Sequence, residues 1–159
     1  MIILGIDPGL NHTGYGLVEI KADKMRSLEY GCITNKINES YLEKIKKIHI
    51  EIEKLIKTYS PHEIVLEEIF FSKNTRSAID VGKVCGAVAL TATLLEIDLK
   101  MYTPLQVKQA VVGYGRASKA QVQAMVKILL CLDKIPKPDH AADALAVAIC
   151  HINSKNPYY

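Results

Sequence analysis

The stretch IILGIDPG (residues 2–9) decides the fold that this sequence is expected to adopt. Its first five residues are mostly apolar and do not alternate with polar groups, which predicts a short strand buried on both faces. Pro8 and Gly9 are turn residues, so we expect the chain to leave the sheet there. Asp7 therefore lies at the end of a buried strand, where its charge is costly unless a partner compensates it. A divalent cation is the simplest such partner.

The composition is typical of one globular domain. The chain has 159 residues, of which 49% are hydrophobic and 23% charged. Its apolar runs end well before the ~18 residues that cross a membrane, and its first residues lack a basic region with a cleavage site. We therefore expect a single domain over residues 1–159, with 153–159 as a disordered tail, in the cytoplasm. The four cysteines have no CxxC spacing, which favours buried free thiols over a zinc site or a disulfide.

The net charge of +3 is unevenly distributed along the chain. Residues 100–137 contain seven Lys or Arg residues and one Asp, which gives this stretch +6 and leaves −3 for the remainder. A basic side indicates a polyanion as partner. An accidental asymmetry on a solvated surface explains the charge equally well.

The order of strand and helix signals predicts an α/β fold. Residues 13–20 and 25–34 read as strands that form an antiparallel meander with the first. Ser40 opens a capping box and an amphipathic helix that ends at Tyr59. The next strand covers 63–68, and the crossover through the helix makes it parallel to the first strand. The elements expected after it are a fifth strand at 99–103 and helices at 78–96, 104–112, 119–132 and 139–151.

The helix at 78–96 is apolar almost all round and has Ser77 as its expected cap. Such a helix in a globular protein is buried on more than one side. Two explanations stay open: a second subunit covers its outer side, or it is a central helix of the monomer.

Acidic residues are expected to meet at one edge of the sheet. Parallel strands end at the same edge, so the terminal carboxylates of strand 63–68 fall beside Asp7. Successive strand residues point to opposite faces, so one of Glu67 and Glu68 points toward Asp7, and we select Glu67. The plain alternative is that Glu67 is an ordinary surface residue.

The last helix adds His140 and Asp143, which lie three residues apart and hence on one face. Asp139 suits the N-cap position. Clusters dominated by carboxylates suit Mg²⁺, and a cluster that also contains a histidine suits Mn²⁺ as well. Two such ions can activate a water and stabilise a leaving oxygen during phosphodiester hydrolysis. The alternative is that Asp139 and Asp143 only complement the helix dipole.

A second group of residues favours nucleic-acid binding. Phe70 precedes a polar loop that contains Lys73 and Arg76, and an aromatic beside basic residues can stack on unpaired bases or wedge a base step. The alternative is that the aromatic covers the edge of the core. Arg116 belongs to another basic loop, after Gly113.

Several motifs, in this order along the chain, resemble the RuvC family of Holliday-junction resolvases. The likeness covers nearly the whole chain. The motifs are GIDPG (5–9), TGYG (13–16), LEEIFFSKN (66–74), QVKQ (106–109), GYG (113–115), SKAQVQ (118–123) and AADALA (141–146).

The resemblance implies a ribonuclease-H-like fold, a five-stranded mixed sheet flanked by helices. It also implies a homodimer that makes paired, metal-dependent nicks in four-way DNA junctions during recombination and repair, in cooperation with a branch-migration helicase. Two Mg²⁺ ions per site are implied, with Mn²⁺ as a substitute.

The resemblance further implies roles for individual residues. Asp7, Glu67 and Asp143 match the catalytic acids that bind the metal. The remaining catalytic position falls on His140, where many members carry Asp and some carry His, and Asp139 is one place earlier.

Three other positions match residues that contact DNA. Phe70 matches the aromatic that inserts at the crossover. Lys108 and Lys119 match basic residues near the scissile strand.

Two other functions remain to be weighed. Actin/hexokinase-type ATPases also open with a Gly-Ile-Asp-x-Gly turn, but they need two such domains around the nucleotide. A junction-binding protein without catalysis would explain the basic residues but not the convergence of acids.

Overall fold

The computed structural model describes residues 1–68 and 75–155, with the side chains of 75–77 left out. Within these residues the chain forms five strands and five helices. In chain order they are β1 (Ile2–Asp7), β2 (His12–Lys21), β3 (Lys24–Thr34), α1 (Tyr41–Tyr59), β4 (Glu63–Glu67), α2 (Thr75–Leu94), β5 (Asp98–Tyr102), α3 (Pro104–Val112), α4 (Lys119–Leu129) and α5 (Asp139–Lys155).

The strands form one mixed sheet in the order β3-β2-β1-β4-β5. The β1, β2 and β3 strands pair antiparallel, while β4 pairs parallel with both β1 and β5. The expected meander and the two parallel strands are therefore both present. Because β1 and β4 run in the same direction, Asp7 and Glu67 end at the same edge of the sheet.

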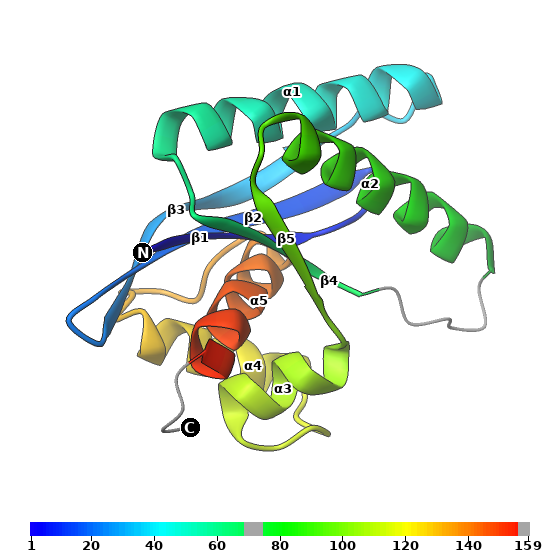
Figure 1. The fold of residues 1–159 in the computed structure, drawn as a ribbon. Helices are drawn as coiled ribbons and strands as arrows, with labels where there is room; N and C mark the ends of the chain where they lie inside the picture. The colour runs from blue at the N-terminus through cyan, green and yellow to red at the C-terminus, as the bar shows by residue number, and fades with distance from the viewer. Residues whose placement is uncertain (69–74, 156–159) are drawn as a thin grey trace.

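Helices cover both faces of the sheet. The α1 and α2 helices lie on one face, and α3, α4 and α5 lie on the other (Figure 1). Leu4 and Ile6 of β1 are buried in the core beneath α1 and α2, while Ile3 belongs to the core on the α5 side. Alternate residues of one strand thus fill two cores, which explains why the first stretch of the sequence is apolar throughout.

Glycines let the first turns of α5 lie directly on β1 and β2. A Cβ atom on Gly5 would lie 2.1 Å from the carbonyl oxygen of Ala144. A Cβ atom on Gly14 would lie 2.0 Å from the carbonyl oxygen of His140. Any side chain at either position would push the helix off the sheet, so these glycines set the distance between α5 and the end of β1.

The α2 helix differs from its prediction in two respects. It begins at Thr75, so the expected cap Ser77 lies inside the helix. One side of α2 packs beside α1. On its other side Ile79, Leu90 and Leu94 remain 53%, 60% and 65% exposed, so that side is uncovered among the described residues. It is therefore not a central helix in a single copy of the chain.

The α5 helix corrects two expectations about the end of the chain. Asp139 is its first residue and not a preceding cap. The helix continues to Lys155, so residues 153–155 are not part of a tail. The side-chain nitrogen of Asn153 donates a hydrogen bond to the carbonyl of Ala110 in α3 at 2.9 Å, and this contact fixes the last turn. Residues 156–159 lie outside the described residues.

Two smaller expectations have mixed outcomes. The α4 helix ends at Leu129 and not at Leu132. All four cysteines are free thiols, but Cys131 is exposed, unlike the buried Cys85 and Cys150. Within the described residues, the helices are each too short or too polar to span a bilayer.

Candidate active site

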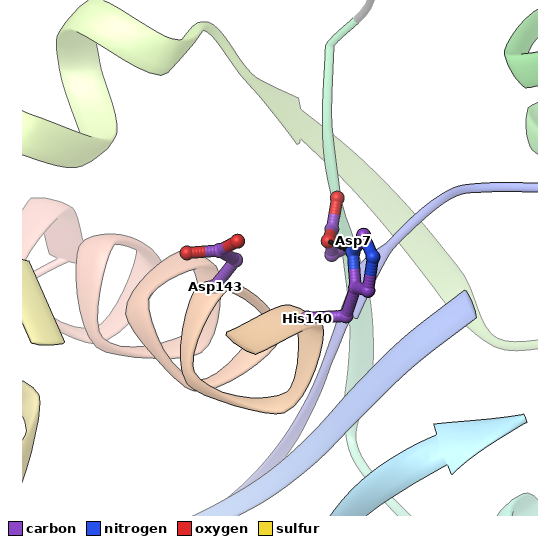
Figure 2. A group of neighbouring side chains, drawn as sticks. All are labelled: Asp7, His140 and Asp143. Carbon is purple, nitrogen blue, oxygen red and sulfur yellow. Dashed lines mark hydrogen bonds and ion pairs between the residues drawn. The ribbon is translucent and has the colours of Figure 1, made fainter. Parts of the chain in front are cut away.

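The end of β1 meets the first turn of α5. The Nδ1 atom of His140 lies 2.7 Å from Oδ2 of Asp7, and the carboxylate accepts a hydrogen bond from the imidazole. Asp143 lies one turn further along the helix and points into the same space (Figure 2). Because α5 packs closely against Gly14, His140 and Asp7 come into direct contact although they lie 133 positions apart in the sequence.

These three side chains form the candidate metal-binding cluster of the described residues. Asp7, His140 and Asp143 each offer a ligand atom, and these atoms all lie within 4.8 Å of one another. Two carboxylates and one imidazole make a hard oxygen site with one nitrogen, which suits Mg²⁺ or Mn²⁺.

Glu67 lines a cleft that adjoins this cluster at Asp143. The cleft has a volume of about 290 Å³, and its lining includes Glu67, Lys108, Lys119 and Asp143. Burial, together with the charges of Asp7 and Asp143, raises the pKa of Glu67 to about 7. This carboxyl group therefore lies close to the cluster, although it is not one of its three members.

Asp7 and Glu67 are acids whose ionisation is disfavoured by burial. Burial raises the pKa of Asp7, and the charge of Asp143 adds to the rise, while the hydrogen bond from His140 opposes it. Raised pKa values on both Asp7 and Glu67 mean that their ionised forms are costly here. A divalent cation would relieve this cost, so the residues present fit a bound metal ion.

Lys119 partly balances the acids. Its Nζ atom donates a hydrogen bond to Oδ2 of Asp143 at 2.7 Å. Burial alone would lower the pKa of Lys119, but the hydrogen bond and the charge of Asp143 raise it. Lys108 is half-buried on α3 and lines the same cleft. Both lysines selected from the sequence therefore lie beside the acids.

Two neighbouring acids lie outside the cluster. Glu68 follows the end of β4 and is exposed, which agrees with the selection of Glu67. Asp139 forms an ion pair with Lys137 at 2.7 Å and lies 3.9 Å from Lys119. The geometry thus favours His140 over Asp139 as the neighbour of Asp7.

The remaining candidates for DNA contact are only partly placed. Arg116 is exposed in the loop between α3 and α4. Phe70 and Lys73 lie outside the described residues, and only the backbone of Arg76 is described, in the first turn of α2. Their contacts with DNA stay predictions.

One neighbour of the cluster was not selected from the sequence. The ring of His12 stacks on the ring of His140, with centroids 5.7 Å apart and planes 15° from parallel. The sequence contains only a weak signal for this residue, since a lone histidine after a turn has no chemical pattern. Its position five residues after Asp7 is the one feature that pointed toward the site.

A mixed sheet of this order, with carboxylates and lysines gathered where its parallel strands end, defines a ribonuclease-H-like nuclease. The chain belongs to the RuvC family, because residues 3–151 match the family model described as crossover junction endodeoxyribonuclease RuvC. Neither the ATPase nor the non-catalytic alternative is supported by this family.

Relatives of known name match nearly the whole chain. The crossover junction endodeoxyribonuclease RuvC of Ruminiclostridium cellulolyticum is 53% identical over 154 residues, which is 97% of this chain and 93% of that protein. The RuvC of Halothermothrix orenii is 48% identical over the same shares of each chain.

Solved structures agree with the fold. A Thermus thermophilus RuvC structure has a TM-score of 0.89 and 36% identity, covering 96% of this chain and 94% of that chain. T. thermophilus RuvC in complex with a Holliday junction substrate has a TM-score of 0.92 and 37% identity, covering 97% and 94%. The predicted ribonuclease-H-like fold is confirmed.

Proposed function

We propose that this chain resolves Holliday junctions by making paired nicks in four-way DNA through metal-dependent hydrolysis of phosphodiester bonds. The observation that carries the proposal is the convergence of Asp7, His140 and Asp143, with Glu67 lining the adjoining cleft. Membership of the RuvC family and the likeness to a relative solved with a Holliday junction support the substrate.

Magnesium is the proposed metal, with two ions per site and Mn²⁺ as a substitute. Asp7, Glu67, His140 and Asp143 would hold these ions. When bound, the ions would activate a water and stabilise the leaving oxygen. The raised pKa values of Asp7 and Glu67 support this proposal, because burial, with a contribution from the neighbouring carboxylates, makes their ionised forms costly in the absence of a cation.

The chain's own residues would orient the DNA strand and balance its charge. Lys108 and Lys119 flank the acids and would neutralise the phosphate as negative charge develops on it. Lys119, which donates to Asp143 in this structure, would be placed to contact the phosphate once that carboxylate serves as a metal ligand. Arg116, which is exposed in the loop between α3 and α4, would attract a further backbone phosphate.

The function is tested by a labelled synthetic four-way junction on a denaturing gel, with and without Mg²⁺ or Mn²⁺. We expect cuts at symmetry-related positions in two strands, only when the metal is present. Binding without cutting in either metal would favour the non-catalytic alternative. Metal-independent cutting would contradict the proposed chemistry.

Lys119→Ala is expected to slow cutting by about 10- to 100-fold, because it removes a positive charge that would stabilise the negative charge developing on the phosphate. It should weaken junction binding modestly and reduce the slope of log K against log salt by about 1. Both quantities are measured by junction titrations at several salt concentrations. Lys127→Ala, in the last turn of the same helix, is the matched control. An unchanged salt slope for Lys119→Ala would mean that this lysine never meets a phosphate.

A homodimer would supply the two sites that paired nicks require. Its proposed interface is the outer side of α2, where Ile79, Leu90 and Leu94 are exposed. Exposed apolar side chains gathered on one helix face are typical of a contact surface. Cooperation with a branch-migration helicase stays a prediction from the family resemblance.

Leu90→Glu is expected to raise the dissociation constant of the dimer on the order of 100-fold, because it would bury a charge in an apolar contact. Sedimentation velocity over a range of concentrations measures this. Leu42→Glu is the control, since Leu42 is an equally apolar residue on α1 and is 74% exposed. A Leu90→Glu protein that dimerises like the parent would place the interface elsewhere.

A further inference from the structure

The turn between β1 and β2 is fastened by buried polar side chains that the proposed chemistry does not use. The hydroxyl of Thr13 donates to the carbonyl of Gly9 at 2.7 Å, and the side-chain nitrogen of Asn35 donates to the carbonyl of Leu10 at 2.7 Å. Thr13 is fully buried and Asn35 is 5% exposed. These two hydrogen bonds satisfy backbone carbonyls of the turn and restrict its movement.

A buried lysine fastens the same turn from the other side. Lys44 of α1 is only 8% exposed, and its ammonium donates a hydrogen bond to the side-chain oxygen of Asn11 at 2.8 Å. The backbone nitrogen of Asn35 also donates to the carbonyl of Asn11 at 2.9 Å. Burying an ammonium is costly, so this lysine is expected to hold its one amide partner firmly. The residue that follows Asn11 is thereby placed with little freedom.

That residue is His12, and its ring stacks against the His140 imidazole. The centroid separation of 5.7 Å and the angle of 15° are those of an offset stack. The edge of His140 is fixed by the 2.7 Å contact between Nδ1 and Asp7. His140 is therefore held at its edge by Asp7 and on its face by His12, although its side chain is 43% exposed.

The space beside the stack is open. A hollow of about 480 Å³ borders both rings, and Thr34 and Lys137 contribute to its lining. Removing the His12 ring would enlarge this hollow and free the His140 imidazole to turn away from Asp7. Ordering a freed side chain again at each binding event costs conformational entropy.

We propose that His12 is a positioning residue that holds the His140 ring in the orientation in which it joins Asp7 and the bound cation. It acts through the face of its ring and not as a ligand, since among the described residues the close group of donor atoms comprises Asp7, His140 and Asp143. The inference rests on the proposed metal cluster. It predicts that a ring is required at position 12, and that a ring nitrogen is not.

The test is the affinity of the DNA-free protein for MnCl₂, measured from the electron paramagnetic resonance signal of unbound Mn²⁺. His12→Ala is expected to weaken Mn²⁺ binding about 10-fold, while His12→Phe should stay within about 2-fold of the parent, because only the former loses the stacked ring. Thr34→Ala is the matched control. Thr34 pairs with His12 across β2 and β3 and borders the same hollow, but it has no ring that could stack on His140.

Three results would overturn the proposal. Parental affinity in His12→Ala would show that the stack does not matter. Equal weakening in His12→Phe and His12→Ala would show that the nitrogen matters, and hence that His12 is a ligand. An equal loss in Thr34→Ala would show a general disturbance of the strand end.

Asp7→Asn separates this inference from the metal cluster on which it rests. If Asp7→Asn loses Mn²⁺ while His12→Ala binds it normally, the inference about His12 alone is wrong. If Asp7→Asn also binds Mn²⁺ like the parent, the metal cluster itself is wrong. Should His12→Ala fail to fold in a thermal melt, the His140 ring resonances in the NMR spectrum of His12→Phe decide. A nuclear Overhauser effect between the introduced phenyl ring and the His140 ring is expected, and its absence would contradict the proposal.

Discussion

Asp7→Asn is expected to reduce junction cleavage on the order of 1000-fold, because the proposed site depends on this one carboxylate. The side chain is 16% exposed at the end of β1, contacts His140, and lies close enough to Glu67 for its charge to raise the pKa of that group. Asparagine keeps its size and can still accept a hydrogen bond from His140. It cannot supply the negative charge that two cations would share, so the loss should appear in the chemical step.

Junction binding by the same variant should survive. The substitution removes a negative charge near the bound DNA and leaves the phosphate contacts proposed for Lys108 and Lys119 intact. The affinity for the junction in EDTA should therefore be unchanged or slightly higher. Single-turnover cleavage and a gel-shift titration measure the two quantities. Glu68→Gln is the control, since it removes one carboxylate from an exposed position beside β4. Cleavage by Asp7→Asn at near the parental rate in Mg²⁺ would show that the site has been assigned wrongly.

Glu67→Gln is expected to stabilise the metal-free protein at pH 8 and, at the same time, to abolish cutting. The pKa of Glu67 is raised to about 7 from an ordinary 4.5, chiefly by burial and then by Asp7 and Asp143. Such a group contributes stability that is fully present below pH 4.5 and is lost as the pH rises through about 7. At pH 8 the parent therefore carries the whole cost of an ionised Glu67, about 2 kcal/mol after allowance for partial exposure.

Glutamine removes that cost. In EDTA at pH 8 the Tm of Glu67→Gln should exceed that of the parent by about 5 °C, and the difference should vanish near pH 4.5. Saturating Mg²⁺ should reverse the order, because only the parent gains the full binding energy of the cation. Melting curves at both pH values, with EDTA and with Mg²⁺, measure this, and Glu68→Gln is again the control. A pH-independent difference, or a less stable Glu67→Gln at pH 8 in EDTA, would contradict the cost of ionising Glu67 on which this prediction rests.

Most strands and helices were predictable because their signals are local. An uninterrupted apolar run specifies β1, and three capping boxes mark helix starts at Ser40, Thr103 and Ser118. The end of α5 was not predictable in the same way. Asn153 looks like a tail residue until its partner Ala110, 43 positions away, is known. The sequence around a polar residue does not show whether that residue will be ordered by a hydrogen bond to a carbonyl far away in the chain.

The acids of the site followed from topology and from the family resemblance. Parallel strands had to bring Glu67 and Asp7 to one edge, and the spacing of His140 and Asp143 placed both on one helix face. The finer contacts depend on how closely α5 lies on the sheet. That distance is set by two glycines opposite helix backbone, and no pattern of charges encodes it.

Two contacts show this limit. The ion pair between Lys119 and Asp143 joins residues from different helices, and the stack of His12 on His140 joins a strand to a helix. Each residue alone has an ordinary chemical type. Their roles become visible only when three elements meet at the end of β1.

The most direct test of the metal cluster is anomalous diffraction at the manganese edge from crystals of this chain grown with MnCl₂. Convergence of the acids predicts anomalous peaks within bonding distance of the Asp7 and Asp143 oxygens, with His140 beside them. Well-ordered crystals in which Mn²⁺ appears elsewhere, while the space between Asp7 and Asp143 holds only the Lys119 ammonium, would contradict it.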